Sequence, residues 1–428
     1  MKINPQKEML MTGNSIQNLR ETLSLGLIDL YWLVGVGNIA SPWELVGEKK
    51  YIPLQDVSLS ILVRYLCKYH EESYMPVPPE YQDIFDLINE TDPSLFANRI
   101  SKEKIAIRRF APLFGKSDWN SQQWASGKSD PSSVVNRLFL LVWNNIKQKG
   151  EAGLKEYLQV VEEELIARKL VETPVDKSSG EDLVALNQFL KKGAWKTDTL
   201  RRQTNATLGF SVKDLKRNAS PRPVKLNNSE HKNMPDFNQL MQGKDIQILR
   251  ETLEIGLIDT YWITGTGTID GPWRLNGEES FRPITDPSLS ILVRFLLKYP
   301  EMSLIPKFPN FKTILKKILA VNPKVLDMPG GKKRKKITTR RFASLFGKSD
   351  WNTKNWEQGI SEPTGVVQRL FYIVDNAIKN EGAAGLQKYI DILDEEARAR
   401  GLSDGYKTLQ ESGTWEKRQF LSWLRKEY

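Results

Sequence analysis

The sequence predicts an all-α protein built from two tandem copies of one helical module. The segment LRETL at residues 19–23 returns at residues 249–253. The longer segment LFGKSDWN at residues 113–120 returns without a mismatch at residues 345–352. Apolar residues recur at three- and four-residue steps along residues 134–146, which is the pattern of an amphipathic helix. The chain contains no sustained alternation of apolar and polar residues, so we expect no strands.

Each copy offers several helices with recognisable starts. Residues 61–66 carry a helical apolar pattern after Asp56, a residue suited to cap a helix N-terminus. Residues 154–165 repeat the spacing of residues 134–146 after a break at Gly150 and Gly153.

The repeat also sets the predicted domain boundaries. Two copies of about 190 to 200 residues follow one another, which indicates duplicated domains and not a solenoid of short repeats. Residues 203–244 lose periodicity and gather Asn, Ser, Pro and Lys, which favours a flexible linker. The predicted segments are 14–75 and 76–170 with tail 171–202 in copy one, and 245–305 and 306–402 with tail 403–428 in copy two.

Composition excludes several classes of protein. Of 428 residues, 40% are hydrophobic and 27% charged, as in folded globular proteins. The longest apolar run, residues 138–143, is far shorter than the roughly 20 residues of a membrane span. One cysteine and two histidines leave little for disulfides, metal sites or Ser-His-Asp chemistry. We therefore expect no enzyme activity, no cofactor, no metal, no membrane and no export, while the net charge of +10 favours a polyanionic partner.

The most distinctive motif is a glycine turn between two short helical segments. It reads FAPLFGKSDWNSQQWASG over residues 110–127, and its second copy reads FASLFGKSDWNTKNWEQG over residues 342–359. A small residue lies four positions before Gly115, which suits a close helix contact followed by a sharp turn. Ser117 is placed to cap a second short helix that ends in a buried aromatic, Trp124. This is the arrangement of a helix-turn-helix.

These segments resemble the XRE family, the helix-turn-helix domains of phage repressors and their bacterial relatives. Gly115, Trp124 and Gly127 keep the spacing typical of that family. Copy two keeps it at Gly347, Trp356 and Gly359. The resemblance implies four XRE-like units in the order weak, strong, weak, strong, with connecting helices. A helical hairpin that binds no nucleic acid is the alternative.

The weak units open each copy, and they depart from the family pattern. Gly37 and Pro42 fall where the recognition helix would run, and both residue types disfavour a helix interior. We therefore expect a shortened or remodelled third helix. Packing, self-association or contact with a protein partner is the predicted role, and DNA reading by these units is the alternative.

The resemblance implies that the first half of each recognition helix faces the major groove. Amide side chains at such positions can pair with adenine through two hydrogen bonds. The two aspartates would repel phosphate, so they would have to accept a hydrogen bond from cytosine or cap the helix. The base-reading candidates are Ser117, Asp118, Trp119, Asn120, Gln122 and Gln123 in copy one and Ser349, Asp350, Trp351, Asn352, Lys354 and Asn355 in copy two.

Two interpretations apply to Trp119 and Trp351. As structural residues they fill the core where Ser121 and Thr353 replace the aliphatic residue usual in the family. As functional residues they stack on a sugar or on a thymine methyl group.

Basic residues beside the motif are candidates for contacts to backbone phosphates. Those next to the strong units are Arg108, Arg109, Lys116, Arg340, Arg341 and Lys348. A basic run that only copy two has consists of Lys332, Lys333, Arg334, Lys335 and Lys336. Its position before the motif favours a phosphate or minor-groove arm, and a solvated loop is the alternative.

The predicted function is sequence-specific binding of double-stranded DNA by a covalent pseudo-dimer, whose linker tethers two copies that read different half-sites. We expect a cytoplasmic, nucleoid-associated bacterial protein that regulates transcription or binds an origin or transfer site of a mobile element. A helical scaffold that binds protein partners without reading DNA is the alternative.

Overall fold

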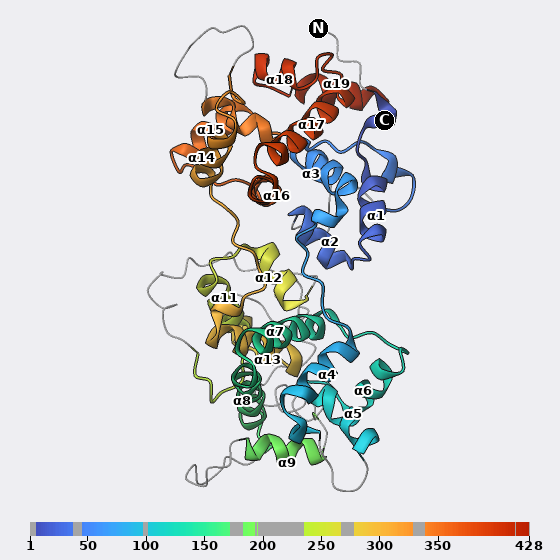
Figure 1. Ribbon diagram of the computed structural model, residues 1–428, viewed down its shortest axis with the longest axis vertical. Coiled ribbons are helices and arrows are strands. Elements are labelled where there is room, and N and C mark those ends of the chain that lie inside the picture. Colours follow the sequence, from blue (N-terminus) through green and yellow to red (C-terminus); the bar gives the residue numbers. More distant parts are fainter. Residues whose placement is uncertain are drawn as a thin grey trace. The chain divides into compact units, whose positions relative to one another are not determined.

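The computed structural model describes residues 6–36, 45–96, 102–171, 183–192, 195, 235–266, 278–327, 339–415 and 417–427. These residues form helices joined by turns, with two isolated β-bridges, Thr12 to Pro53 and Gln242 to Pro283, and no strand (Figure 1). The prediction of an all-α protein is confirmed.

The same series of helices occurs in each copy. Copy one contains α1 (Gly13–Thr22), α2 (Leu27–Val34), α3 (Val57–Lys68), α4 (Tyr81–Thr91), α5 (Lys102–Leu113), α6 (Asp118–Ala125), α7 (Ser133–Lys149), α8 (Glu151–Ala167) and α9 (Val184–Lys192). Copy two contains α11 (Gly243–Thr252), α12 (Leu257–Thr264), α13 (Pro287–Lys298), α14 (Phe311–Val321), α15 (Asp350–Glu357), α16 (Gly365–Glu381), α17 (Ala383–Ala399), α18 (Tyr406–Ser412) and α19 (Lys417–Glu427). Where copy one has α5, copy two has a 3-10 helix, Thr339–Phe346.

The helices begin where the sequence pattern places them. Asp56 caps α3 through its side chain, which accepts the backbone N–H of Ser58 at 2.8 Å. The apolar stripes of residues 134–146 and 154–165 lie in α7 and α8, and their apolar members are buried. Local pattern therefore determines these elements.

The predicted linker extends too far at its C-terminal end. Met241 is only 1% exposed, and its carbonyl accepts the N–H of Ile284 at 2.7 Å. Helix α11 already begins at Gly243. Residues 235–244 therefore belong to the folded part. Their polar composition resembles that of a linker, but Met241 among them is buried in the core. The rest of the predicted linker lies outside the described residues.

The chain forms two compact units, and each unit combines halves of both copies. Unit 1 contains Met1–Met75 and Lys307–Tyr428, and unit 2 contains Pro76–Pro306. We call the four half-copies N1 (residues 1–75), C1 (76–202), N2 (235–306) and C2 (307–428). Unit 1 is then N1 with C2, and unit 2 is C1 with N2, so the two copies exchange their halves.

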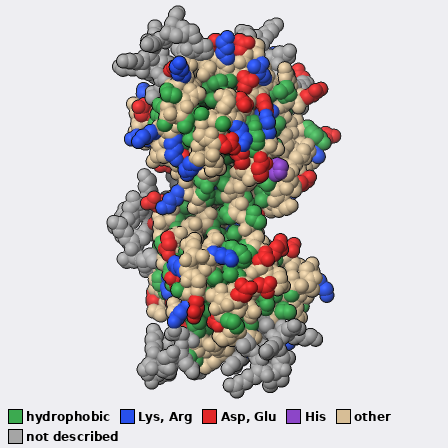
Figure 2. All heavy atoms as spheres, viewed as in Figure 1, with side chains coloured by type: hydrophobic (Ala, Val, Ile, Leu, Met, Phe, Trp, Pro, Cys, Tyr) green, Lys and Arg blue, Asp and Glu red, His purple; other side chains and the backbone are tan. Residues whose placement is uncertain are grey.

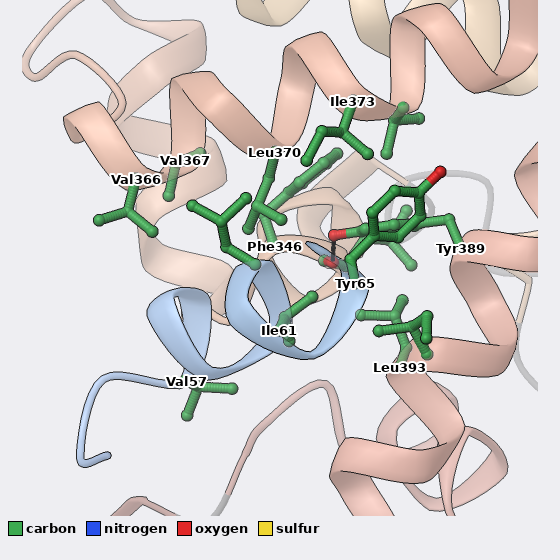
Figure 3. Packing of buried hydrophobic residues seen from close by; sticks show 14 of the residues in the cluster. Val57, Ile61, Tyr65, Phe346, Val366, Val367, Leu370, Ile373, Tyr389 and Leu393 are labelled. Atoms are coloured by element: carbon green, nitrogen blue, oxygen red, sulfur yellow. Dashed lines mark hydrogen bonds between the residues drawn. The ribbon is translucent and has the colours of Figure 1, made fainter. Parts of the chain in front are cut away.

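The core of unit 1 shows how closely the exchanged halves pack. Val57, Ile61 and Tyr65 of α3 lie against α16 and α17 of copy two (Figure 3). The Tyr65 ring lies 6.3 Å from the ring of Tyr389, centroid to centroid. In unit 2 the equivalent pair is Phe295 of α13 and Tyr157 of α8, at 5.9 Å. Each N-half therefore completes the hydrophobic core of a C-half from the other copy.

A buried ion network accompanies each of these cores. In unit 1 the carboxylate of Glu396 accepts hydrogen bonds from Arg64 of N1 at 2.8 Å and from Arg400 at 2.6 Å. Glu396 is 0% exposed, Arg64 8% and Arg400 2%. Backbone carbonyls of Met9 and Leu54 accept further bonds from the two guanidinium groups. The charges are thus removed from water with their hydrogen-bonding groups engaged, as buried ions require.

Unit 2 repeats the network at corresponding positions. Glu164 accepts from Arg294 of N2 at 2.8 Å and from Arg168 at 2.5 Å. The guanidinium groups also donate to backbone carbonyls of N2, among them Ile284 and Gln239. The exchange therefore uses one docking geometry twice.

Proline-containing segments connect the halves within each copy. The segment SYMPVPP, residues 73–79, joins N1 to C1, and SLIPKFP, residues 303–309, joins N2 to C2. Neither segment belongs to a helix. Proline fixes φ and holds the preceding residue extended, so these connections disfavour the chain reversal that would fold a copy onto itself.

Cleavage of the linker should leave the two copies associated. A protease site inserted between residues 203 and 234 would yield two fragments, each of which supplies half of both units. Because the cores and the buried ion networks join the fragments, we expect a 1:1 complex in size-exclusion chromatography and separation only in denaturant. Fragments that elute separately in native buffer would contradict the exchanged fold.

Candidate nucleic-acid interface

The strong unit of each copy is built around a glycine turn. Gly115, with φ +75°, follows α5, and Gly347, with φ +73°, follows the 3-10 helix of copy two. Ser117 occupies the N-cap position of α6 in extended conformation, but its side chain makes no capping hydrogen bond, so the predicted capping role is correct only in position. Trp124 and Trp356 are each 7% exposed and pack in the core. The short helices α6 and α15 are therefore anchored at their C-terminal ends.

Three side chains satisfy the carbonyls that precede the turn of C1. The Pro112 oxygen accepts from Trp195 Nε1 at 2.9 Å, and the Leu113 oxygen accepts from the Tyr157 hydroxyl at 2.9 Å. The Phe114 oxygen accepts from Ser288 Oγ at 2.6 Å, and Ser288 belongs to N2. Carbonyls at a helix end have no partner within the helix, so these bonds fix the end of α5.

Copy two repeats the three bonds with equivalent residues. The carbonyls of Ser344, Leu345 and Phe346 accept from Trp415, Tyr389 and Ser58 at 2.7, 2.7 and 2.6 Å. In both units, one of the three donors comes from the N-half of the other copy. The carbonyls at each turn therefore depend on an N-half for one of their three hydrogen bonds.

The turn glycines also lie against the N-terminus of the exchanged helix. A Cβ atom at Gly115 would lie 2.4 Å from the Ser288 nitrogen, and one at Gly347 would lie 2.5 Å from the Ser58 nitrogen. The approach is reciprocal, because a Cβ at Gly265 of N2 would lie 2.7 Å from the Val134 nitrogen at the start of α7. In each compact unit, the glycine turns thus lie at the contact between the N-half of one copy and the C-half of the other.

The prediction that Trp119 and Trp351 fill the core is wrong. Their exposed fractions are 60% and 64%. The hydroxyl of Ser121 occupies the core position instead, where it accepts the backbone N–H of Ala111 at 2.8 Å. Thr353 accepts the N–H of Ala343 in the same way. A hydrogen bond to the preceding helix, which an aliphatic residue cannot form, explains these two small polar residues.

Exposed side chains gather on one face of each short helix. Trp119 and Gln122 are exposed on α6, and Trp351 and Lys354 are exposed on α15. They are separated by three residues and so lie on the same helical face. On α15 the Lys354 Nζ lies 5.1 Å from the centroid of the Trp351 ring, a cation–π distance. We call these surfaces the α6 face and the α15 face.

Among the other base-reading candidates, Ser349 is exposed and the rest are half-buried. Asn120 donates to Ser117 Oγ at 2.8 Å and Asn352 to Ser349 Oγ at 3.0 Å, so both amides turn back toward the helix start. Gln123 and Asn355 are half-buried.

The two equivalent aspartates have different surroundings. Asp118 Oδ1 accepts the backbone N–H of Trp119 at 2.9 Å. Asp350 Oδ2 would lie 2.8 Å from a Cβ at Gly413, so the tail of copy two approaches it closely.

Few of the predicted phosphate contacts remain available. Arg341 is a correction, because it is 7% exposed and donates to the Glu411 carbonyl at 2.9 Å in the tail of copy two. Arg109 is half-buried and donates to the Leu95 carbonyl at 3.4 Å, whereas Arg108 is exposed. The side chain of Arg340 lies outside the described residues. So do Lys332, Lys333, Arg334, Lys335 and Lys336.

The turn lysines bind carboxylates of the exchanged halves. Lys348 Nζ lies 3.0 Å from Asp56 Oδ2, and Lys116 Nζ lies 3.2 Å from Asp286 Oδ1. Burial by itself raises the pKa of Asp56, but Lys348 and the N–H groups at the start of α3 outweigh it and hold that pKa below its usual 3.8. The carboxylate is therefore charged at neutral pH and competes with any phosphate for the lysine.

Acidic and basic side chains are mixed over the visible surface of both units (Figure 2). The described residues contain no cluster of His, Cys, Asp and Glu arranged to hold a metal ion. Among the described helices, none combines the length and apolarity needed to cross a membrane.

Four residues that complete the glycine turn from the other copy were not among the site residues predicted from the sequence. Two of them, Asp56 and Asp286, cap their own helices and also bind the turn lysine of the opposite copy. The other two, Ser58 and Ser288, donate their hydroxyls to a turn carbonyl of the opposite copy. The strict repetition of SLSILVR at residues 58–64 and 288–294 could have indicated them. In comparisons with known proteins, no family model, curated sequence or solved structure matches this chain.

Proposed function

We propose that this protein binds double-stranded DNA sequence-specifically through the α6 and α15 faces. The observation that carries the proposal is the exposure of Trp119 and Trp351 at the same position of two helices that follow glycine turns, at 60% and 64%. A tryptophan left in water gains nothing for the fold, so an exposed pair at equivalent positions favours a binding role.

The neighbouring side chains suit base edges. Gln122 offers an amide that can pair with adenine, and Lys354 can donate to guanine. The ring of Trp119 or Trp351 can pack on a thymine methyl group. Because Gln122 and Lys354 occupy equivalent positions, the two copies would prefer different half-sites. This supports the role of a transcriptional regulator or an origin- or transfer-site binding protein of a bacterial mobile element.

The second candidate is a scaffold that binds a protein partner through the same faces. The pairing of Lys116 and Lys348 with carboxylates favours it, because this removes two cations from the N-terminal ends of the helices. An exposed tryptophan also suits a protein interface.

Selection from a pool of random duplexes followed by fluorescence anisotropy tests the proposal. Each of the substitutions Trp119→Ala and Trp351→Ala should cost about 1–3 kcal/mol of binding free energy on the selected duplex and less on a scrambled one. Tyr51→Ala, at a residue 57% exposed outside both faces, is the control and should change nothing. Failure to enrich any duplex would reject DNA reading and favour the scaffold.

A further inference from the structure

The two docking surfaces between exchanged halves share their geometry but differ in charge. In unit 1, Glu72 of N1 pairs with Lys388 of α17, with side chains 26% and 20% exposed, and the Tyr65 hydroxyl donates to Glu72. At the corresponding positions of unit 2 the sequence has Met302, Glu156 and Phe295. The acidic residue, its lysine partner and the hydroxyl that holds it are therefore specific to unit 1.

A second ion pair is reversed between the C-halves. In C2, Lys388 also pairs with Glu381 at 3.1 Å. In C1 the corresponding residues are Glu156 and Lys149, which pair at 2.8 Å with the charges exchanged. Lys149 also lies 3.7 Å from Glu301 of N2. Each N-half thus places a glutamate next to the lysine of the C-half on which it packs.

Pairing within a copy would oppose like charges at these positions. The shared geometry would bring Glu72 to Glu156 in copy one and Glu301 to Glu381 in copy two. The side chains of Glu72 and Glu156 are each only 26% exposed, so their carboxylates would repel at contact distance, which is a common device against a wrong partner. Glu301 and Glu381 are 60% and 44% exposed, so their repulsion contributes little. Glu71 alone would gain, opposite Lys149, but its side chain is 63% exposed, and exposed pairs contribute little.

The ring contacts at the docking surface also differ between the two units. The Tyr74 ring of N1 lies 5.2 Å from the ring of Tyr372 and 6.4 Å from that of Phe308, both in C2. In unit 2 the positions of Tyr74 and Tyr372 are taken by Leu304 and Leu140, which are buried. Pairing within a copy would place an aromatic ring where its counterpart is aliphatic.

We infer that these side chains make each docking surface selective, so that N1 accepts a half-copy of the C2 kind and rejects one of the C1 kind. The partner that fits the N1 surface is a C-half that has a lysine at the position of Lys388 and an aromatic residue at the position of Tyr372. The inference concerns the pairing of halves and is independent of DNA binding.

Zero-length cross-linking can read out which halves pair. Lys68 Nζ lies 2.5 Å from Glu395 Oε1 in unit 1, and Lys298 pairs with Glu163 in unit 2. Because both copies have Lys and Glu at these positions, pairing within a copy would instead join Lys68 to Glu163. Carbodiimide treatment of the monomeric full chain, digestion and mass spectrometry would give the ratio of the two kinds of cross-linked peptide.

The wild-type chain should give Lys68–Glu395 and Lys298–Glu163 peptides. Glu72→Lys opposes Lys388 in the exchanged pairing and attracts Glu156 in the other, so the ratio should fall by about tenfold or more, which corresponds to about 1.4 kcal/mol. Adding Lys388→Glu should move the ratio back toward the wild-type value. The control Glu71→Lys makes the same charge change at the neighbouring residue and should leave the exchanged peptides dominant.

Glu156→Lys tests the same selectivity by a change in C1 instead of N1. It turns the contact with Glu72 into an attraction without changing Lys388, so within-copy peptides should appear. This variant also covers the case in which Glu72→Lys does not fold. An unchanged ratio in the folded variants would overturn the inference and leave the pairing to the proline connections alone.

Discussion

Glu396→Gln should destabilise unit 1 by about 3–5 kcal/mol, because it leaves the buried guanidinium groups of Arg64 and Arg400 without a counter-charge. For a unit of this size the loss corresponds to a fall of roughly 6–20 °C in the midpoint of its thermal unfolding. Circular dichroism melting of the full chain measures it. Glu164→Gln should do the same to unit 2 through Arg294 and Arg168.

The adjacent residue provides a matched control. Glu395 pairs with Lys68 at the surface, with side chains 37% and 45% exposed. Exposed pairs contribute at most about 1 kcal/mol, so Glu395→Gln should hardly move the midpoint. Equal effects of the two substitutions would show that the buried network is not what holds the exchanged halves together.

The same carboxylate predicts a pH dependence. Burial by itself raises the pKa of Glu396, but Arg400 and Arg64 outweigh it, so its pKa lies below the usual 4.5. A lowered pKa in the folded state stabilises the fold above the usual pKa, and this stabilisation is lost as the pH falls through the lowered value. The wild-type chain should therefore lose stability below about pH 4.5 more steeply than Glu396→Gln.

Gly347→Ala should cost unit 1 about 2–5 kcal/mol. About 1–2 kcal/mol comes from placing a Cβ in the left-handed conformation. A further 1–3 kcal/mol, roughly, comes from displacing the start of α3, whose Ser58 nitrogen would lie 2.5 Å from the new atom. Gly115→Ala should affect unit 2 equally, since Ser288 of α13 lies at the same place. Urea unfolding followed by tryptophan fluorescence measures both.

Gly359 and Gly127 separate the two contributions. Their φ angles are +68° and +64°, yet nothing lies within 4 Å of an added Cβ. Gly359→Ala and Gly127→Ala should therefore cost only the conformational part, about 1–2 kcal/mol. If all four substitutions cost the same, the approach of the exchanged helix to the turn would carry no energy.

Much of the local structure follows from short-range pattern. Asp56 caps α3, Gly115 turns the chain after α5, and Trp124 is buried, all as the sequence predicts. The cap depends on neighbours within a few residues, and the turn depends on the ability of glycine to adopt a positive φ. The predicted phosphate contacts depend instead on the tertiary structure. Lys116 and Arg341 read as free surface cations, yet contacts from residues far along the chain engage both.

The two tryptophans of the motif also show what a local pattern does not predict. The motif gives Trp119 and Trp124 similar apolar character, but only Trp124 is buried. The difference arises because Ser121 hydrogen-bonds the preceding helix at Ala111 and takes the core position between them. An apolar pattern alone does not reveal that a polar side chain will find a backbone partner in the core.

The sequence by itself determined that this protein is helical, that it is duplicated, and where its glycine turns lie. These properties depend on local spacing and on self-comparison. Only the tertiary structure decided that N1 packs on C2 and N2 on C1. Both copies carry the arginine and glutamate of the buried network, as Arg64 with Glu396 and Arg294 with Glu164. Because both copies carry the same docking residues, the sequence does not specify which N-half packs on which C-half. The pairing depends on contacts between residues that are 130 and 332 positions apart.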